Sequence, residues 1–269
     1  MNSAQLTEAR ERLLKTAVDY FASDPAVLGI FLSGSIAAET ADAYSDIDLR
    51  VVVSPDEHQR VVRDRLEMPK AWGDFLFNEW LEGAQHCVSH FRPFGKIDVF
   101  YISLAEFRPS PWYSLPTEVL YDPRGLVKDT ITKSEGLAFA IPEDEIDRSV
   151  SKGLASAHEA YRRLRRGELF FAQSLLDNLR HYMIQADDWL HHRPPQAVTF
   201  SGLEKRASQP LIEAFKNSYA GRDAVSIEQV LLRLLVVYRE QIIALHKQFG
   251  LSRPLKNDLY AIDVIQAQA

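Results

Sequence analysis

The pattern of apolar and polar positions changes near the middle of the chain and predicts two different halves. In the first half, an apolar repeat at helical spacing predicts a helix over residues 4–22, and Ser54-Pro55 opens a second helix to about 66. Short apolar runs between turn residues predict strands. These strands are expected over 27–32, 46–53, 74–82, 85–92, 96–101 and 118–120.

The second half shows only helical periodicity. Apolar residues recur three and four positions apart, which predicts helices packed as a bundle. The helices are expected over about 142–166, 168–191 and 226–249, with Ser226 as the last N-cap and short helices within 201–219. Residues 124–141 are expected to link the halves. The sequence therefore predicts an α+β fold: a mixed-sheet domain over 1–140, followed by an α-helical bundle over 141–269.

Composition narrows the class of protein. The 269 residues are 46% hydrophobic and 25% charged, an ordinary globular balance. The net charge of −6 argues against a long nucleic acid as partner, because such chains usually present a basic surface. The single cysteine, Cys87, allows no internal disulfide. Neither a signal peptide nor an apolar run of about 20 residues is visible, so we expect no membrane partner and a cytoplasmic location.

Three aspartates stand on predicted strands, where aspartate is usually depleted. Asp46 and Asp48 lie two positions apart and should project to the same face, while Ile47 and Leu49 point into a core. Asp98 lies on a later strand between apolar neighbours. Clustered carboxylates suit a hard divalent cation such as Mg²⁺, with room left for water and phosphate oxygens.

A glycine-serine turn follows the first predicted strand. Gly34 lets the backbone approach a phosphate closely, and Ser35 stands where a short helix over 36–40 is expected. Backbone N–H groups and the helix dipole there would favour an anion beside the metal. Together these features suit metal-assisted nucleotidyl transfer, in which a third carboxylate such as Asp98 binds metal or accepts a proton.

This arrangement resembles the DNA polymerase beta-type nucleotidyltransferase superfamily. Its signature is an apolar residue, Gly-Ser, a spacer of about ten residues, then Asp-apolar-Asp-apolar, with a later carboxylate on a neighbouring strand. Here it reads Leu32, Gly34-Ser35, Asp46-Ile47-Asp48-Leu49 and Asp98. The layout of a strand domain before a helical half resembles the antibiotic nucleotidyltransferases, which act on aminoglycosides or lincosamides.

The resemblance implies a magnesium-dependent enzyme. It would transfer a nucleoside monophosphate from a nucleoside triphosphate, with ATP as the expected co-substrate, to a hydroxyl of a small molecule, as in antibiotic resistance. Asp46, Asp48 and Asp98 would be the catalytic metal ligands, and Gly34 and Ser35 would hold the β- and γ-phosphates. The helical half would be the substrate-binding domain.

A cationic acceptor is the further expectation. The chain is acidic, and Asp177, Asp187 and Asp188 share one predicted helix, with Glu79 on a strand. Carboxylates around a cleft between sheet and helices would attract a hydroxylated amine and repel a polyphosphate backbone.

Two further segments carry residues of chemical interest. His86, Cys87 and His90 could suggest zinc, but strand alternation separates the cysteine from both histidines. Residues 161–166 are basic and are either a triphosphate clamp or cations at a helix C-terminus.

Other functions also stay open. A toxin–antitoxin-type nucleotidyltransferase acting on protein or RNA would use an Arg-x(4–6)-His pair, and Arg239 and His246 match its outer spacing. A regulatory nucleotide-binding module is a further alternative. The acceptor, the nucleotide, the general base and the oligomeric state are not predicted.

Overall fold

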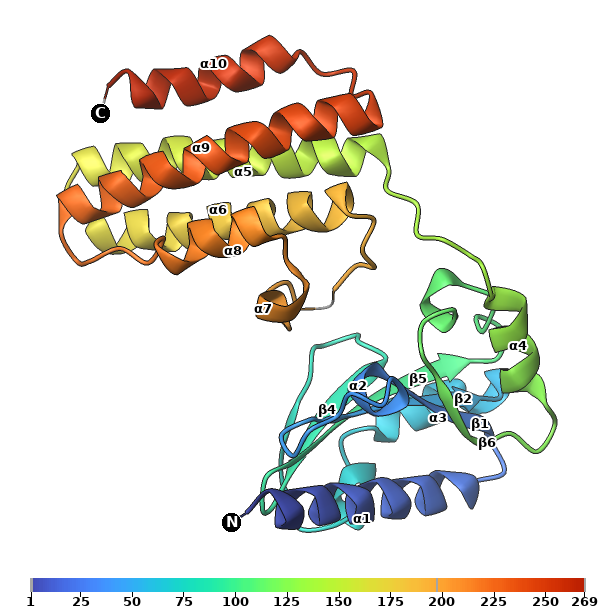
Figure 1. Ribbon diagram of the computed structural model, residues 1–269. Helices are drawn as coiled ribbons and strands as arrows, with labels where there is room; N and C mark the ends of the chain where they lie inside the picture. The colour runs from blue at the N-terminus through green and yellow to red at the C-terminus, as the bar shows by residue number, and fades with distance from the viewer. Residues whose placement is uncertain (1, 197, 269) are drawn as a thin grey trace. The chain divides into compact units, whose positions relative to one another are not determined.

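The computed structural model describes residues 2–196 and 198–268. The chain divides into two compact units, and the boundary falls between Ala138 and Phe139 (Figure 1). The outermost positions of the two expected domains, 1 and 269, lie outside this description. Every strand of the described residues is in the first unit, and the described part of the second is helical. The predicted α+β class, a mixed sheet followed by helices, is confirmed.

The first unit is built on a six-stranded sheet in the order β3-β4-β5-β2-β1-β6. The strands are β1 Val27–Ser33, β2 Ile47–Val53, β3 Phe75–Glu79, β4 His86–Phe91, β5 Gly95–Ser103 and β6 Glu118–Tyr121. Neighbours are antiparallel except β2 and β5, which run parallel. The sheet is therefore mixed, with its one parallel pair at the centre.

Helices α1 (Ser3–Ala22) and α3 (Pro55–Asp64) pack on one face of this sheet, close to their predicted ranges. The apolar stripe of α1 lies against alternate residues of the central strands, and Phe21 is fully buried there. The 3-10 turn η1 (Met68–Ala71) adds to the same core. This burial fixes which side chains of β2 and β5 point to the opposite face.

The opposite face is partly covered by α4 (Leu126–Ser134) and the 3-10 turn η2 (Pro111–Tyr113). The segment 124–141, expected to link the halves, therefore also contains a helix that packs on the sheet. The apolar stripe of α4 is short, and two of its buried positions are the polar residues Thr130 and Ser134. Ser134 Oγ donates to the carbonyl of Thr130, so the buried hydroxyl is satisfied inside the helix.

The second unit buries its own core between long helices (Figure 1). They are α5 Glu143–Arg165, α6 Leu169–Leu190, α9 Ala224–Phe249 and α10 Leu255–Gln266, with the shorter α7 Leu203–Arg206 and α8 Gln209–Lys216. Two details differ from expectation. Asp223, not Ser226, caps α9 by accepting from the Ser226 N–H, and α10 follows where no helix was predicted.

None of the helices within the described ranges combines the length and the apolar character that a membrane span requires.

Candidate active site

Asp48 and Asp98 lie directly opposite each other on β2 and β5. Neighbouring strands are about 4.8 Å apart, and direct partners share a face, so the two carboxylates project side by side. Asp46 differs from expectation because β2 begins at Ile47, which leaves Asp46 in the segment just before the strand. Its carboxylate is nevertheless tied to the same place through Lys96, as described below.

Gly34 packs against Asp48. It is the first residue of α2 (Gly34–Ala37), and its φ of +68° is a conformation that side chains other than glycine rarely adopt. A Cβ at this position would overlap Oδ2 of Asp48. The glycine is thus required both by its backbone angle and by the carboxylate beside it.

The turn itself is shorter than predicted. Helix α2 has four residues and starts at Gly34, whereas a helix over 36–40 was expected. One turn carries little of the macrodipole of a long helix. Ser35 follows Gly34 directly and is half-buried, so any anion held here would depend mainly on backbone N–H groups and the serine hydroxyl.

Lys96 is the residue that sequence reasoning missed. Its Nζ donates to Asp46 Oδ2 at 2.7 Å and to Asp98 Oδ2 at 3.4 Å, and lies 3.3 Å from Asp98 Oδ1. Burial alone would lower the pKa of Lys96, but the hydrogen bond to Asp46 and the charges of Asp98 and Asp46 raise it. The ammonium is therefore firmly charged and bridges two of the three aspartates.

The pKa values of the two facing aspartates are raised above their ordinary value. Burial raises the pKa of Asp48 above its ordinary value, and the charge of Asp46 raises it further. Burial also raises the pKa of Asp98, against the lowering effect of Lys96. A cation placed near both would therefore gain from neutralising them.

The carboxylates fit a hard divalent cation by their chemistry. Oδ1 of Asp98 is buried without a hydrogen-bond partner, and the bridging ammonium of Lys96 marks a place where positive charge is already favoured. With Lys96 between them, however, the described side chains form no group of three that could share one ion. Two carboxylates with phosphate and water oxygens would suffice for Mg²⁺.

A second cation stands on the same sheet face. Arg50, two residues after Asp48, has its Cζ over the Phe100 ring at 3.9 Å from the centroid, and His86 stacks on that ring at 5.1 Å. Among the residues that the structure describes, the guanidinium donates one hydrogen bond, to the carbonyl of Leu49, which is long at 3.5 Å. No carboxylate of the described chain lies within ion-pair distance of Arg50, which leaves most of its donors available to an anion.

The histidines of β4 do not form a zinc site. Cys87 is buried on the other face, as the strand alternation predicted. His90 stacks on Phe77 at 4.3 Å, and its Nε2 lies 2.5 Å from Glu79 Oε1. Glu79 is thus on the same sheet face as Asp98, two strands away, and is engaged by a histidine.

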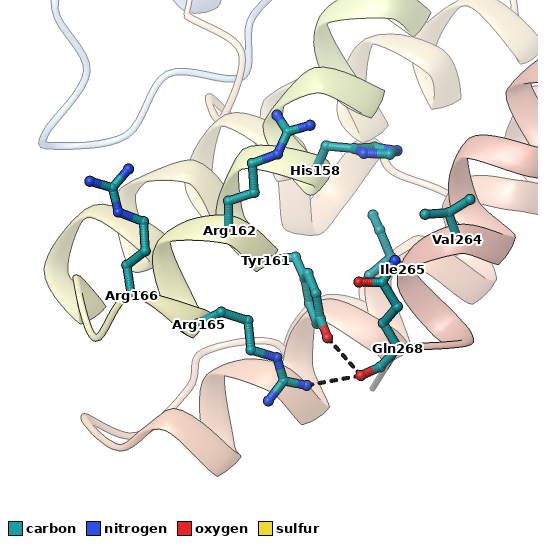
Figure 2. Close-up of a pocket in the computed structure, with 8 residues that line it drawn as sticks. All are labelled: His158, Tyr161, Arg162, Arg165, Arg166, Val264, Ile265 and Gln268. Carbon is teal, nitrogen blue, oxygen red and sulfur yellow. Dashed lines mark hydrogen bonds between the residues drawn. The ribbon is translucent and has the colours of Figure 1, made fainter.

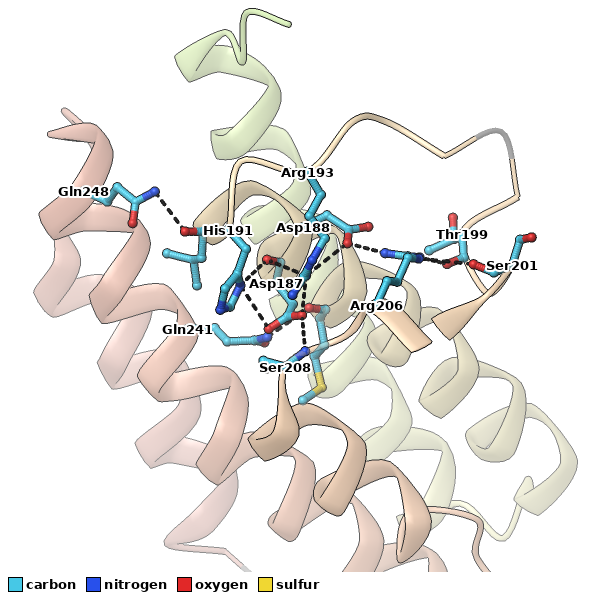
Figure 3. A network of polar contacts seen from close by, with 12 residues as sticks. Asp187, Asp188, His191, Arg193, Thr199, Ser201, Arg206, Ser208, Gln241 and Gln248 are labelled. Atoms are coloured by element: carbon cyan, nitrogen blue, oxygen red, sulfur yellow. Dashed lines mark hydrogen bonds and ion pairs between the residues drawn. The ribbon is translucent and has the colours of Figure 1, made fainter. Parts of the chain in front are cut away.

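The helix carboxylates expected to meet a cationic acceptor are already neutralised within the second unit (Figure 3). Asp187 is 3% exposed and accepts from Arg193 at 2.6 Å and from the Ser208 N–H at 2.9 Å. Asp188 pairs with Arg193 and Arg206. Their role in binding an ammonium is therefore corrected to a structural one, since the arginines occupy the acceptor oxygens.

Asp177 has a partner of the same kind. Asp177 accepts a hydrogen bond from Arg180 at 2.6 Å. Arg180 is itself fully buried and also donates to the hydroxyl of Ser218. Removing the aspartate would leave a buried cation unpaired, which supports a structural role here as well.

The basic segment at the end of α5 lines a cavity of about 380 Å³ against α10 (Figure 2). Each arginine that lines it has a carboxylate partner. These pairs are Arg162 with Glu159, Arg165 with Glu228 and Arg166 with Glu168. Cations at a helix C-terminus, each with its own counter-charge, describe this segment better than a triphosphate clamp.

Arg239 and His246, the spacing that suggested an RNA-cutting pair, are likewise engaged. Arg239 donates to Asp263 at 2.6 Å, and the largely buried His246 lies 3.1 Å from Asp258. Asp258 also receives two hydrogen bonds from Arg253. Both residues therefore join α9 to the C-terminal helix.

A comparison of the sequence with known protein families finds a match within the first unit. The family model of the nucleotidyltransferase domain matches residues 13–80, which include the glycine-serine turn and the first two aspartates. No curated protein is significantly similar to the chain in sequence.

Comparison with solved structures gives two matches, both with a TM-score below 0.5. The aminoglycoside 6-adenyltransferase of Bacillus subtilis has a TM-score of 0.45 at 12% identity, covering 94% of this chain and 97% of that one. A nucleotidyltransferase-like protein from Exiguobacterium sibiricum has a TM-score of 0.45 at 11% identity, covering 89% and 77%. The assignment rests on the domain match alone: residues 13–80 of the first unit match the nucleotidyltransferase domain.

Proposed function

We propose that the chain transfers a nucleoside monophosphate from a nucleoside triphosphate, with ATP as the expected donor, to a hydroxyl of a small molecule. The observation that carries this proposal is the direct pairing of Asp48 with Asp98 beside the Gly34 turn, within the matched domain. Asp46, Asp48 and Asp98 are the proposed metal ligands. Gly34 and Ser35 are the proposed contacts of the β- and γ-phosphates.

Mg²⁺ bound by these carboxylates would neutralise phosphate charge and favour departure of pyrophosphate. The chain's own residues supply the rest. Arg50 is placed to donate to a phosphate oxygen, because its guanidinium stands over Phe100 and its hydrogen bond to Leu49 is long. Asp98 either completes the metal site or accepts the proton of the attacking hydroxyl, since its raised pKa suits a proton acceptor.

The acceptor is proposed to be a hydroxylated small amine of the aminoglycoside or lincosamide kind. This choice of acceptor is supported by the family resemblance and the acidic composition. The helix aspartates no longer support it, since they are paired with arginines. A reducing, cytoplasmic setting belongs to the same proposal, since the single cysteine, Cys87, is a buried free thiol.

The metal assignment is tested by Asp48→Asn and Asp98→Asn. Each removes a charge with little change of shape, and transfer from α-labelled ATP should fall about a hundred- to a thousandfold with the circular dichroism spectrum unchanged. Asp129→Asn is the matched control, because Asp129 is exposed and pairs only with Lys133. Near-normal transfer by Asp48→Asn would reject the site.

The acceptor is tested by incubating the protein with α-labelled ATP, GTP, CTP or UTP, magnesium and a panel of such antibiotics, alongside RNA and protein acceptors. Label on a hydroxylated amine supports the proposal. Label confined to RNA or protein would instead favour the toxin–antitoxin alternative.

A further inference from the structure

Lys96 occupies a position that the proposed metal site needs. Its Nζ is 2.7 Å from Asp46 Oδ2 and 3.3 Å from Asp98 Oδ1, between two of the three carboxylates. Magnesium binds oxygen at 2.0–2.1 Å. An ion that draws on oxygens of both Asp46 and Asp98 therefore has no room while the ammonium stands between the same oxygens.

The geometry explains why the ammonium is there. Three carboxylates gathered at the start of two central strands repel one another, and part of the Asp98 carboxylate is buried. Lys96 is two residues before Asp98 on β5, so strand alternation puts both side chains on one face. Its side chain is 35% exposed, which leaves the flexible stem free to carry the ammonium away.

We propose that Lys96 is a tethered counter-cation that holds Asp46 and Asp98 together in the metal-free protein and must be displaced when a divalent ion binds both. Lys96 thereby weakens the affinity for the metal alone. Once displaced, its ammonium needs a new anionic partner, which the phosphates of the bound nucleotide provide. This inference rests on the proposed function, since it assumes that the carboxylates bind metal.

The test measures Mn²⁺ binding by electron paramagnetic resonance, on the full chain without nucleotide, at constant pH and ionic strength. Lys96→Met keeps the length of the side chain and removes its charge. We expect Mn²⁺ to bind about tenfold more tightly to Lys96→Met than to the wild type, because one competing charge is gone. Lys133→Met is the control, since Lys133 forms a comparable ion pair with the exposed Asp129, and its affinity should not change.

A second measurement covers the metal-free state. In the presence of chelator, Lys96→Met should unfold at a lower temperature than the wild type. Addition of Mn²⁺ should raise the unfolding temperature of Lys96→Met by more than it raises that of the wild type. If Lys96→Met does not fold, Lys96→Gln takes its place with the same expected direction. Equal or weaker Mn²⁺ binding by the neutral variant would overturn the role of Lys96.

The proposed metal site and the role of Lys96 can be rejected separately. If the Asp48→Asn variant binds Mn²⁺ as tightly as the wild type does, the proposed metal site is wrong. If Asp48→Asn abolishes binding and the neutral Lys96 variant binds no more tightly, only the counter-cation role is wrong.

Discussion

At the scale of single residues, the contact between Gly34 and Asp48 makes the glycine irreplaceable for two separable reasons. Gly34→Ala would pay about 1 kcal/mol for a positive φ and would also push against the Asp48 carboxylate. We expect nucleotidyl transfer to fall about hundredfold, because small displacements of a catalytic group have effects of that size.

Gly125→Ala separates the two reasons. Gly125 has a φ of +70°, but a Cβ there would meet nothing within 4 Å. Both variants should lose the stability that a positive φ costs, and Gly34→Ala should lose more because of its overlap with Asp48. Only Gly34→Ala should lose transfer activity. Equal activity losses would mean that the contact with Asp48 is unimportant.

The residues of the site differ in how far they could be predicted. Asp48 and Asp98 could be placed on one face because strand alternation fixes where short side chains point. The same alternation places Lys96 and Arg50 on that face, but their contacts could not be predicted, because both have long flexible side chains whose partners depend on the register between β2 and β5. Apolar patterns specify which face a residue takes but not the partner of a charged group.

At the scale of elements, Gly153 allows α5 to approach α9 closely. A Cβ at Gly153 would overlap the hydroxyl and ring of Tyr238. Alanine in a helix interior is ordinarily about 1 kcal/mol more favourable than glycine. Here we expect Gly153→Ala to destabilise the chain by about 1–3 kcal/mol, as overpacking does, in urea unfolding.

The matched background is Tyr238→Leu, which removes the obstructing ring. In that background Gly153→Ala should become neutral or stabilising. A stabilising effect in the wild-type background would contradict the close packing of the two helices.

The buried Asp187 links stability of the helical unit to pH. Burial alone would raise the pKa of Asp187, but hydrogen bonds from Ser208 and Arg193 lower it below its ordinary value. Because the pKa of Asp187 is lower in the folded protein than in the unfolded chain, the ionised carboxylate stabilises the fold. This stabilisation is complete above the pKa of the unfolded chain, about 3.9, and is lost as the pH falls through the pKa of the folded protein. Asp187→Asn should therefore destabilise by about 2–3 kcal/mol at pH 7.

Thermal unfolding between pH 7 and pH 3 checks this. The gap between Asp187→Asn and the wild type should narrow as the pH falls below about 4. Glu213→Gln is the control, because Glu213 is exposed and pairs with Lys216, and it should have little effect at any pH. A gap that stays constant with pH would show that the loss does not come from the ionised carboxylate.

Elements were predictable where an apolar stripe was long. Helices α1, α5, α6 and α9 were expected within a few residues of their bounds, because each buries many regularly spaced apolar side chains. Helix α4 was missed since part of its buried face is polar. The pairing of Asp187 with Arg193 was missed because the arginine comes from the loop after the helix.

At the scale of the whole molecule, each unit buries a core of its own. Between α4 and α5, Glu135, Gly136, Leu137 and Ala138 are all exposed and outside helix or strand. Limited digestion with a glutamate-specific protease should therefore cut first at Glu135 and leave two fragments that keep their secondary structure.

Mass spectrometry would locate the cut, and circular dichroism of the separated fragments would test their folding. The fragment containing residues 139–269 should be almost entirely helical. Rapid further degradation of either fragment would show that its core is insufficient alone.

The parallel pairing of β2 with β5 has a consequence for how this molecule can change. Parallel neighbours need a long crossover, and here it runs from Ser54 to Phe94 through α3, η1 and the β3–β4 hairpin. Asp48 and Asp98 are aligned by their own ladder, whatever sequence joins the strands. Within the hairpin, β4 pairs with β5 and sets Val88 opposite Asp98, whereas β3 is the edge strand. An engineer can therefore graft new surface on β3, beside the carboxylates, as long as β4 keeps its register.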